Sequence, residues 1–256
     1  MKYIIGAETD IGTSKDTNQD SLMCRVADTD YGQVALVVLC DGMGGLAKGE
    51  LASANVVRAF SEWFKNVLPT MMTDQFTPSV VHNSWDNLVQ YQNELLFQYG
   101  KNNYTQLGTT LVAALIYNGQ YYAVNVGDSR MYKLTSSAIE KVTEDQSLVS
   151  KEVAQGKLTE EEAEHDSRRN ILLQCIGATA KVSPDYYEGN LALGEALMLC
   201  CDGFRHEITK QEMFDELKPD LYNNKNEIHD RIAHLIKVNM QRKETDNITA
   251  LVIKAV

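Results

Sequence analysis

The sequence predicts an α+β fold in which antiparallel sheets carry helices on their outer faces. Stretches with the three-and-four spacing of amphipathic helices lie between several short runs of strand character. The dipeptide Asn118-Gly119 joins two of the strand-like runs, and it is a strong short signal for an antiparallel hairpin. Strands and helices do not alternate regularly, as they would in a parallel sheet built from βαβ units, so antiparallel sheets are expected.

The strands are predicted from apolar runs bounded by turn residues. Residues 2–9 and 33–40 come first, and the second run is almost continuously apolar, which indicates burial on both faces. Residues 109–117 and 120–126 flank the hairpin dipeptide and precede a strand at 130–134, so we expect an antiparallel meander here. Further strands are predicted at 185–192, 196–201 and 246–254.

Three long amphipathic helices are predicted. The first is expected to stop near Pro69. The second is expected to start at Thr77-Pro78, because threonine favours the cap position and proline the first helical position, and to end at Gly100. The expected buried stripes are Ala52, Val56, Ala59, Phe60, Trp63 and Val67; then Val81, Trp85, Leu88, Tyr91 and Leu95; then Ile228, Ile232, Leu235 and Ile236.

Residues 144–170 differ from the rest of the chain because they are rich in charged side chains. Within them, the segment from Thr159 to Glu162 has the form of a capping box, which starts a helix. We therefore predict a mobile helical flap that packs on the edge of a sheet. The sequence contains no repeat, low-complexity segment or linker, so residues 1–256 are expected to form a single domain.

Composition limits the class of protein. Of the 256 residues, 44% are hydrophobic and 23% are charged, as is usual for a globular protein, and the formal net charge of −11 argues against a nucleic-acid partner or an acidic membrane. The five cysteines form no C-x-x-C pair, so free thiols in a reducing compartment are expected rather than disulfides or zinc ligands. No targeting or membrane-spanning segment is apparent, which predicts a cytoplasmic protein.

Aspartate residues recur where apolar strands end. Apolar runs lead into Asp41, Asp128 and Asp202, Asp246 opens the last apolar run, and Asp20 lies in an early polar loop. Taken singly, each of these positions is most often a structural turn. Five carboxylates that converged would repel one another, and bound cations would relieve the repulsion. Ligands that are all oxygen indicate Mg²⁺ or Mn²⁺.

Five segments occur in the order expected of the metal-dependent protein phosphatases of the type-2C family, which the chain resembles along almost its whole length. The flap, from Gly156-Lys157-Leu158-Thr159 to Arg168-Arg169-Asn170-Ile171-Leu172, resembles the bacterial branch of that family. The five segments are Thr9-Asp10-Ile11-Gly12 with Asn18-Gln19-Asp20-Ser21, Asp41-Gly42-Met43-Gly44-Gly45, Gly108-Thr109-Thr110, Gly127-Asp128-Ser129-Arg130, and Cys201-Asp202-Gly203 with Asp246-Asn247-Ile248-Thr249.

The resemblance implies a sandwich of two antiparallel sheets with helices on both outer faces and with metals at one end. It implies hydrolysis of phosphoserine and phosphothreonine in proteins by a hydroxide that bridges two Mn²⁺ or Mg²⁺ ions. A third ion is also consistent with the bacterial branch. The expected substrates are phosphoproteins, the expected partner is an opposing serine/threonine kinase, and the expected state is a monomer.

The resemblance also implies a role for each site residue. Asp41 and Asp202 are the predicted catalytic residues, and Asp41 would bridge two ions. Asp128 together with Asp202 would hold the third, weaker ion, and Asp20 would act through water or at the edge of the cluster. The full set of implied metal ligands is Asp20, Asp41, Gly42 through its carbonyl, Asp128, Asp202 and Asp246.

Three positions depart from the family pattern. Lys15 stands where the family usually has a phosphate-binding arginine, and it offers a point charge in place of a bidentate fork. Gln19 stands where many members have glutamate, and Met43 replaces a histidine of eukaryotic members. Lys15 and Gln19 support one alternative, a catalytically weak or inactive phosphatase-like binding module. A structural calcium protein is disfavoured because the chain lacks an EF-hand loop.

The remaining candidate residues are expected to be structural. His82, His206, His229 and His234 lie in helical or loop contexts without evident partners, whereas His165 lies in the flap and could meet substrate. The cysteines beside Asp41 and Asp202 are not in a Cys-x5-Arg loop, which excludes a cysteine-dependent phosphatase mechanism.

Overall fold

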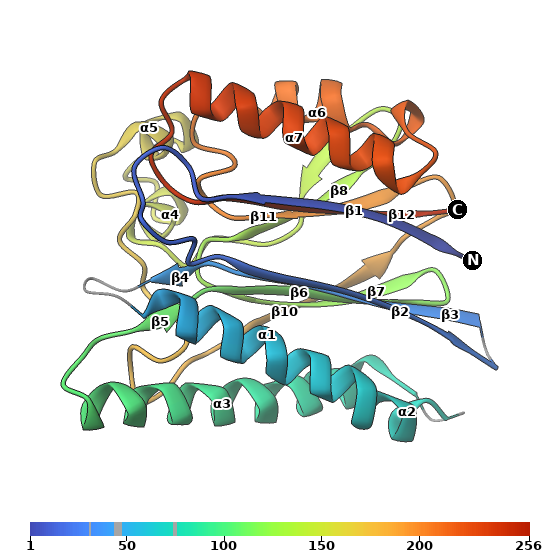
Figure 1. The fold of residues 1–256 in the computed structure, drawn as a ribbon, viewed down its shortest axis with the longest axis horizontal. Helices are drawn as coiled ribbons and strands as arrows, with labels where there is room; N and C mark the ends of the chain where they lie inside the picture. The colour runs from blue at the N-terminus through green and yellow to red at the C-terminus, as the bar shows by residue number, and fades with distance from the viewer. Residues whose placement is uncertain (31, 44–47, 74–75) are drawn as a thin grey trace.

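The computed structural model describes residues 1–30, 32–43, 48–73 and 76–256, which form two antiparallel five-stranded sheets stacked between two layers of helices (Figure 1). This architecture confirms the predicted α+β sandwich. The strands of the first sheet, in spatial order, are β1 (Tyr3–Asp10), β12 (Ile248–Ala255), β11 (Ala196–Cys200), β8 (Arg130–Leu134) and β9 (Ile139–Lys141). Those of the second are β10 (Asp185–Asn190), β7 (Gln120–Val126), β6 (Leu111–Tyr117), β3 (Gly32–Cys40) and β2 (Ser21–Thr29).

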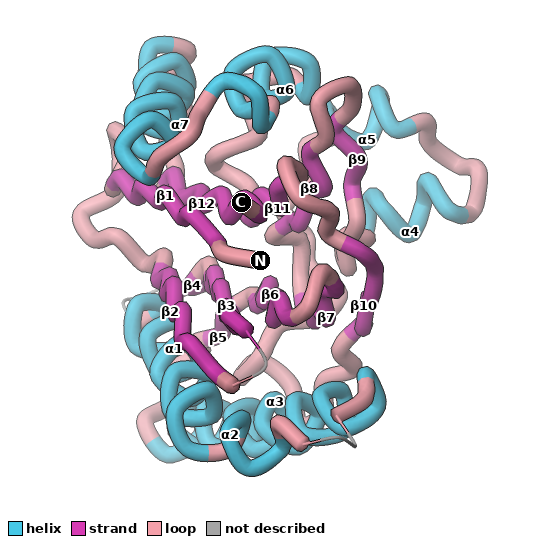
Figure 2. The backbone as a smooth tube through the Cα atoms, turned by 90° about the vertical axis from the view of Figure 1, so that its right-hand side faces the viewer, coloured by secondary structure: helices cyan, strands magenta, loops and turns pink. Residues whose placement is uncertain are grey.

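Helices cover the outer face of each sheet (Figure 2). The second sheet packs against α1 (Gly49–Asn66), α2 (Leu68–Met71) and α3 (Pro78–Asn102). The first packs against α6 (Lys210–Leu217), a 3-10 turn (Pro219–Leu221) and α7 (Lys225–Gln241). The short helices α4 (Leu148–Ala154) and α5 (Glu160–His165) lie at the end of the sandwich opposite the two chain termini (Figure 1). No helix in the described ranges is long and apolar enough to cross a membrane.

Strand β3 explains why the fold has two cores. Its residues from Val34 to Cys40 are at most 1% exposed, as the continuous apolar run predicted. Alternate side chains point to opposite faces of a strand, so Val37 and Leu39 pack between the sheets while Leu36 and Val38 pack against the helices. Each fully buried side chain of this kind contributes about 1.5–3 kcal/mol to stability.

The predicted meander at 109–134 is only half right. Strands β6 and β7 pair through Asn118-Gly119, and both turn residues have the positive φ angles of a type I′ turn. Strand β8, however, leaves this sheet and pairs with β11 in the other one. Gly127, with φ of +99°, turns the chain between the sheets, and a strand pattern alone carries no information about which sheet a strand joins.

Several local predictions also need correction. The edge strand β2, the short strand β9 and helix α6 were not predicted. Helix α3 continues through Gly100 to Asn102, and a Cβ on Gly100 would lie 2.9 Å from the carbonyl oxygen of Thr105, so this glycine permits close packing rather than ending the helix. Tyr91 and Leu95 are 60% and 47% exposed, so the buried stripe of α3 is rotated from the prediction. Its buried residues are Val81, Trp85, Val89, Gln92, Asn93, Leu96 and Gly100.

The helical flap predicted at 144–170 is present, with the predicted capping box. The Thr159 hydroxyl accepts from the Glu162 amide at 3.1 Å, and the Glu162 carboxylate accepts from the Thr159 amide at 2.8 Å. Gln146 connects the base of the flap to edge strand β10 through Asp185 at 2.7 Å, and its side chain also accepts from the Gly127 amide at 3.0 Å. The flap base is therefore attached to the turn that carries Asp128.

Candidate metal centre

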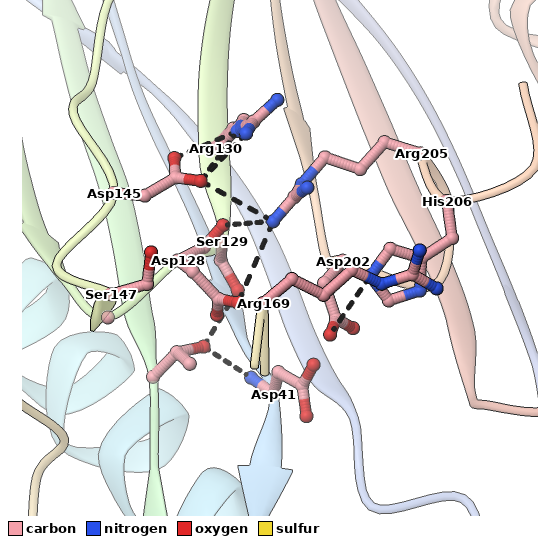
Figure 3. Close-up of polar contacts among 12 residues, drawn as sticks. Asp41, Asp128, Ser129, Arg130, Asp145, Ser147, Arg169, Asp202, Arg205 and His206 are labelled. Carbon is pink, nitrogen blue, oxygen red and sulfur yellow. Dashed lines mark hydrogen bonds and ion pairs between the residues drawn. The ribbon is translucent and has the colours of Figure 1, made fainter. Parts of the chain in front are cut away.

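The predicted site residues gather at the end of the sandwich where several strands begin or end. Asp41 follows β3, Asp128 lies between β7 and β8, and Asp202 follows β11. Figure 3 shows these three side chains approaching one another from separate segments of the chain. Asp20 joins them before β2, and one oxygen each of Asp20 and Asp41 lies within 4.8 Å of the other and of the Cys201 sulfur.

The backbone of Asp41 is held firmly while its carboxylate stays available. Its amide donates to the Thr110 hydroxyl at 2.9 Å, and its carbonyl accepts from the Thr110 amide at 2.8 Å and the Thr109 hydroxyl at 2.9 Å. The short pair of strands β4 (Gly42–Met43) and β5 (Gly108–Thr109) supports this arrangement. Within the described part of the chain, no hydrogen bond reaches the Asp41 carboxylate, which leaves both oxygens for a ligand.

Two carboxylate oxygens in the cluster are buried without a partner. Asp20 Oδ2 accepts from the Thr249 hydroxyl at 2.5 Å, but among the described residues Asp20 Oδ1 has no hydrogen-bond partner, and neither has Asp202 Oδ1. A buried anionic oxygen without a donor is costly. Cations would satisfy these atoms, so the residues present fit divalent metal ions.

The electrostatics of the cluster lead to the same conclusion. Burial, followed by the charges of Asp20, Asp202, Asp128 and Asp246, raises the pKa of Asp41 well above its usual value. Burial and nearby carboxylates also raise the pKa of Asp20 to about 7 and the pKa of Asp128 to about 7. Without cations these groups retain protons that a carboxyl group in water would lose, and bound cations would displace those protons.

Glycines allow the strand ends to approach closely. A Cβ on Gly42 would lie 2.3 Å from the Gly49 carbonyl oxygen, and a Cβ on Gly203 would lie 2.2 Å from the Asn247 carbonyl oxygen. In the orientation that satisfies its amide, the Gln19 side chain donates to the Gly42 carbonyl at 3.2 Å and accepts from the Gly49 amide at 3.2 Å. Gly44 and Gly45, which complete the segment that begins at Asp41, lie outside the described residues.

Lys15 and Asp246 lie together at the rim of the cluster. Lys15 Nζ is 3.0 Å from Asp246 Oδ1, and the lysine side chain is 42% exposed. Partial burial lowers the pKa of Lys15, but the hydrogen bond to Asp246 and the charges of Asp246, Asp41 and Asp202 raise it above its usual value overall. A positive charge therefore faces the carboxylates from the solvent side.

A buried ion-pair network behind Asp128 was not found from the sequence. Arg130 forms a bidentate pair with Asp145, with Nε and Nη2 contacts of 2.8 and 2.7 Å. Arg205 lies between Asp145 and Asp128, 3.6 Å from a carboxylate oxygen of each, and it also donates to the Asp128 carbonyl at 3.2 Å (Figure 3). Two arginines thus partly compensate the negative charge on this side of the cluster.

The prediction that four histidines lack partners is wrong for three of them: His82 stacks on Tyr186, with ring centroids 4.9 Å apart, and His206 and His229 face carboxylates. His206 lies between Asp202 and Glu244, at 3.5 and 3.2 Å, and its side chain is only 7% exposed. His229 pairs with Glu8 on the surface at 2.7 Å. The sequence did offer a signal for His206, because it follows Asp202 by four residues, but its second partner comes from the far end of the chain.

The cysteines behave as expected. All five are free thiols. Burial raises the pKa of Cys201 well above its usual value, and the nearby carboxylates add to the effect. Its sulfur accepts from the Thr249 amide at 3.1 Å. Cys201 is therefore a poor nucleophile despite its place beside the aspartates.

Buried carboxylates with free oxygens at one end of a two-sheet sandwich define a centre for hard divalent cations. The family model for "Protein phosphatase 2C" matches residues 12–238 of the chain. The serine/threonine phosphatase Stp of Listeria welshimeri is 31% identical over 86% of this chain and 84% of its own length. A putative type-2C protein phosphatase of Streptococcus pyogenes is 31% identical over 97% and 96%, respectively.

Solved structures agree with the sequence comparisons. Stp1 from Staphylococcus aureus superposes with a TM-score of 0.85 at 29% identity, over 100% of this chain and 96% of that one. The S. agalactiae serine/threonine phosphatase gives 0.85 at 28% identity, over the whole of both chains. The chain therefore belongs to the protein phosphatase 2C family, which confirms the resemblance seen in its motifs.

Proposed function

We propose that the protein is a serine/threonine phosphatase that hydrolyses phosphoserine and phosphothreonine in proteins with Mn²⁺ or Mg²⁺ as its cofactor. The observation that carries the proposal is the group of buried aspartates with oxygens free for cations at one end of the sandwich. Membership of the type-2C family supports the reaction class, because the matched relatives are serine/threonine phosphatases.

The metal ligands we propose are those implied by the motifs. Asp41 would be shared between two ions, and Asp202 and Asp246 would complete the first of these sites. Asp128 would join Asp202 at a third, weaker site. The Gly42 carbonyl would be a further ligand, since a carbonyl oxygen has two lone pairs and Gln19 uses one. Bound divalent cations supply Lewis acidity, which neutralises phosphoryl charge and lowers the pKa of water.

Two ions per chain are the minimum that this ligand set suggests. The catalytic domain of PstP, a fold relative with a TM-score of 0.79, was solved with two manganese ions. The proposed third ion rests on the buried pair of Asp128 and Asp202, because burial, followed by the charge of Asp202, raises the pKa of Asp128 to about 7.

The protein's own residues position the substrate around the cations. Lys15 at the rim would bind a non-bridging oxygen of the phosphoryl group, which its charge attracts. The locked backbone at Asp41 and the hydrogen bond from Thr249 to Asp20 hold carboxylates in place before substrate arrives. The flap helices, whose base is attached to the Asp128 turn, would bound the surface on which a phosphoprotein docks.

The remaining details of the proposal concern biological context. We propose a single type-2C domain across residues 1–256, a monomeric state, a cytoplasmic location and a serine/threonine kinase as the opposing activity. An inactive binding module is not proposed. The five aspartates Asp20, Asp41, Asp128, Asp202 and Asp246 support an active enzyme, and of the three departures from the family pattern only Lys15 and Gln19 favour a binding module.

The proposal is tested by phosphate release from a phosphothreonine peptide, measured on metal-stripped protein with and without added Mn²⁺. We expect no turnover in EDTA, turnover on addition of excess Mn²⁺ or Mg²⁺, and little release from a matched phosphotyrosine peptide. Turnover that persists after complete removal of metal would overturn the proposed mechanism. Binding of the peptide without any release at saturating Mn²⁺ would instead identify a binding module.

A further inference from the structure

His206 and Glu244 form a buried bridge at the edge of the metal centre. The Nε2 atom of His206 lies 3.5 Å from Asp202 Oδ2, and its Nδ1 atom lies 3.2 Å from Glu244 Oε2 (Figure 3 shows His206 beside Asp202). The side chains of His206 and Glu244 are 7% and 5% exposed. Each ring nitrogen of His206 thus lies beside a carboxylate oxygen.

Glu244 extends the bridge to the backbone that carries Asp246. Its second oxygen, Oε1, accepts from the amides of Thr245 at 2.6 Å and Asp246 at 2.8 Å. Its backbone carbonyl accepts from the Thr13 hydroxyl at 2.7 Å, which attaches the loop that leads to Lys15. Each oxygen of Glu244 therefore has a partner: His206, the segment that enters the last strand, or Thr13.

The two carboxylate oxygens of Asp202 have different surroundings. Oδ2 faces His206, whereas Oδ1 is buried without a partner in the described ranges and is left for a cation. The side chains of His206 and Asp202 are only 7% and 12% exposed, so little of this contact faces solvent. Groups that orient metal ligands in this way typically account for about 10–100-fold in metal affinity.

We propose that the His206–Glu244 bridge fixes the position of the Asp202 side chain relative to the turn that carries Asp246. By doing so, it sets the affinity of the centre for cations. The inference rests on the proposed function, since it assumes that these aspartates bind divalent ions. His206 and Glu244 are positioning residues, and neither contacts the phosphoryl group. They affect the free energy with which the cations bind to the site, which precedes catalysis.

The test is Mn²⁺ binding to metal-stripped protein at one fixed pH, followed by electron paramagnetic resonance, which reports free Mn²⁺. We expect His206→Ala to raise the Kd of the tightest ion by about 10–100-fold. Glu244→Gln keeps an acceptor for the two backbone amides, so its effect is expected to be smaller. Saturating Mn²⁺ is expected to restore kcat in His206→Ala, since the ligands themselves are intact.

A matched control is His229→Ala, which removes another histidine–carboxylate pair, His229 with Glu8 at 2.7 Å, from the surface where α7 meets β1. Its Mn²⁺ affinity is expected to equal that of the wild type. His206→Gln retains a donor at similar reach, so it supplies a folded comparison even if the alanine variant unfolds. We expect its Kd to lie between those of the wild type and His206→Ala.

The outcomes separate this inference from the proposed function. An unchanged Kd in His206→Ala or His206→Gln, with only a lower Tm, would show that the bridge merely packs. Spin-echo modulation from a nitrogen bound to Mn²⁺ would make His206 a direct ligand, which also overturns the positioning role. If wild-type protein binds Mn²⁺ but releases no phosphate, only the proposed function fails, because the affinity comparison still decides the inference. If it binds no Mn²⁺, both fail.

Discussion

The hydroxyl of Thr249, near the C-terminus, donates a 2.5 Å hydrogen bond to Asp20 Oδ2, near the N-terminus. Burial raises the pKa of Asp20 to about 7, and the bond from Thr249 opposes that rise by stabilising the charged form. The segment that leads into β2 and the last strand, β12, therefore cooperate in keeping one carboxylate of the centre ready for a cation.

Replacing Thr249 by valine removes the donor but keeps the shape of the side chain. The pKa of Asp20 is then higher, so Asp20 keeps its proton up to a higher pH, and Mn²⁺ must displace that proton to bind. We expect the Mn²⁺ Kd of Thr249→Val to be raised most near pH 6.5 and to approach the wild-type value as the pH increases toward 8.5. Calorimetric titration at the two pH values measures the difference. Thr249→Ser, which keeps the hydroxyl, is the control, and an effect independent of pH would contradict this account.

The pH dependence of stability in EDTA follows from the raised carboxyl pKa values. Asp20 and Asp128 have pKa values of about 7 in the folded chain and 3.8 as the reference for the unfolded chain, so the folded state binds more protons between these values. Stability from these groups is present below about pH 4 and is lost as pH rises toward 7. We expect a lower Tm at pH 8 than at pH 5.5 in EDTA.

Other titrating groups do not reverse that expectation. Asp166 and Glu212 have pKa values lowered to about 2 by hydrogen bonds to arginine, so their contributions are constant above pH 5.5. Burial lowers the pKa of His82, so the contribution of this group to stability increases with pH, but it is a single group. Excess Mn²⁺ is expected to remove the decrease in Tm at pH 8, because binding to the folded state alone adds stability. A Tm in EDTA that rises across this range would contradict the assigned protonation.

Asp41→Asn is expected to separate stability from activity. Asparagine has nearly the same shape but no charge, so it removes the cost of burying Asp41 among four other carboxylates. We expect a higher Tm in EDTA than the wild type at pH 8. Phosphate release at saturating Mn²⁺ is expected to fall by more than about 100-fold, since loss of a ligand should exceed the loss of an outer partner. Retained activity would show that Asp41 is not the shared ligand.

Lys15→Arg tests the departure from the family pattern. An arginine in this place would offer two parallel donors to a phosphoryl group where lysine offers a point charge. We expect KM for a phosphothreonine peptide to fall severalfold with little change in kcat, and Lys15→Ala to raise KM. Lys141→Arg, at a half-buried lysine that pairs with Glu144, is the matched control and should change neither constant. A change in kcat alone would mean that Lys15 acts on the chemistry.

The strand ends could be predicted from the sequence because each signal is local. Asp41 and Asp202 follow uninterrupted apolar runs, and a buried strand needs no distant residue to reveal it. The residues that contact the site aspartates could not be predicted from a local signal. Glu244 meets His206, and Thr249 meets Asp20, only after the chain has folded. The sheet that β8 joins could not be predicted for the same reason, because the alternating side chains of this strand could be buried equally well in either sheet.

Arg205 supplies the last prediction, because it is the buried cation shared by Asp128 and Asp145. Its side chain is 12% exposed, and it also donates to the Asp128 carbonyl. Arg205→Ala would leave two buried acidic groups with less compensation, and breaking a buried ion pair in this way costs about 3–5 kcal/mol. We expect the free energy of unfolding in urea, measured with EDTA, to fall by that amount.

Metal binding should reveal where the loss of Arg205 acts. The weakest Mn²⁺ site, assigned to Asp128 and Asp202, is expected to change its affinity, whereas the tighter sites should keep theirs. Arg242→Ala, which removes an exposed pair with Glu212, is the control and should leave the urea midpoint close to that of the wild type. An equal change at all Mn²⁺ sites would mean that Arg205 supports the whole end of the sandwich rather than Asp128, because only a general loosening would reach Asp41 and Asp246 as well.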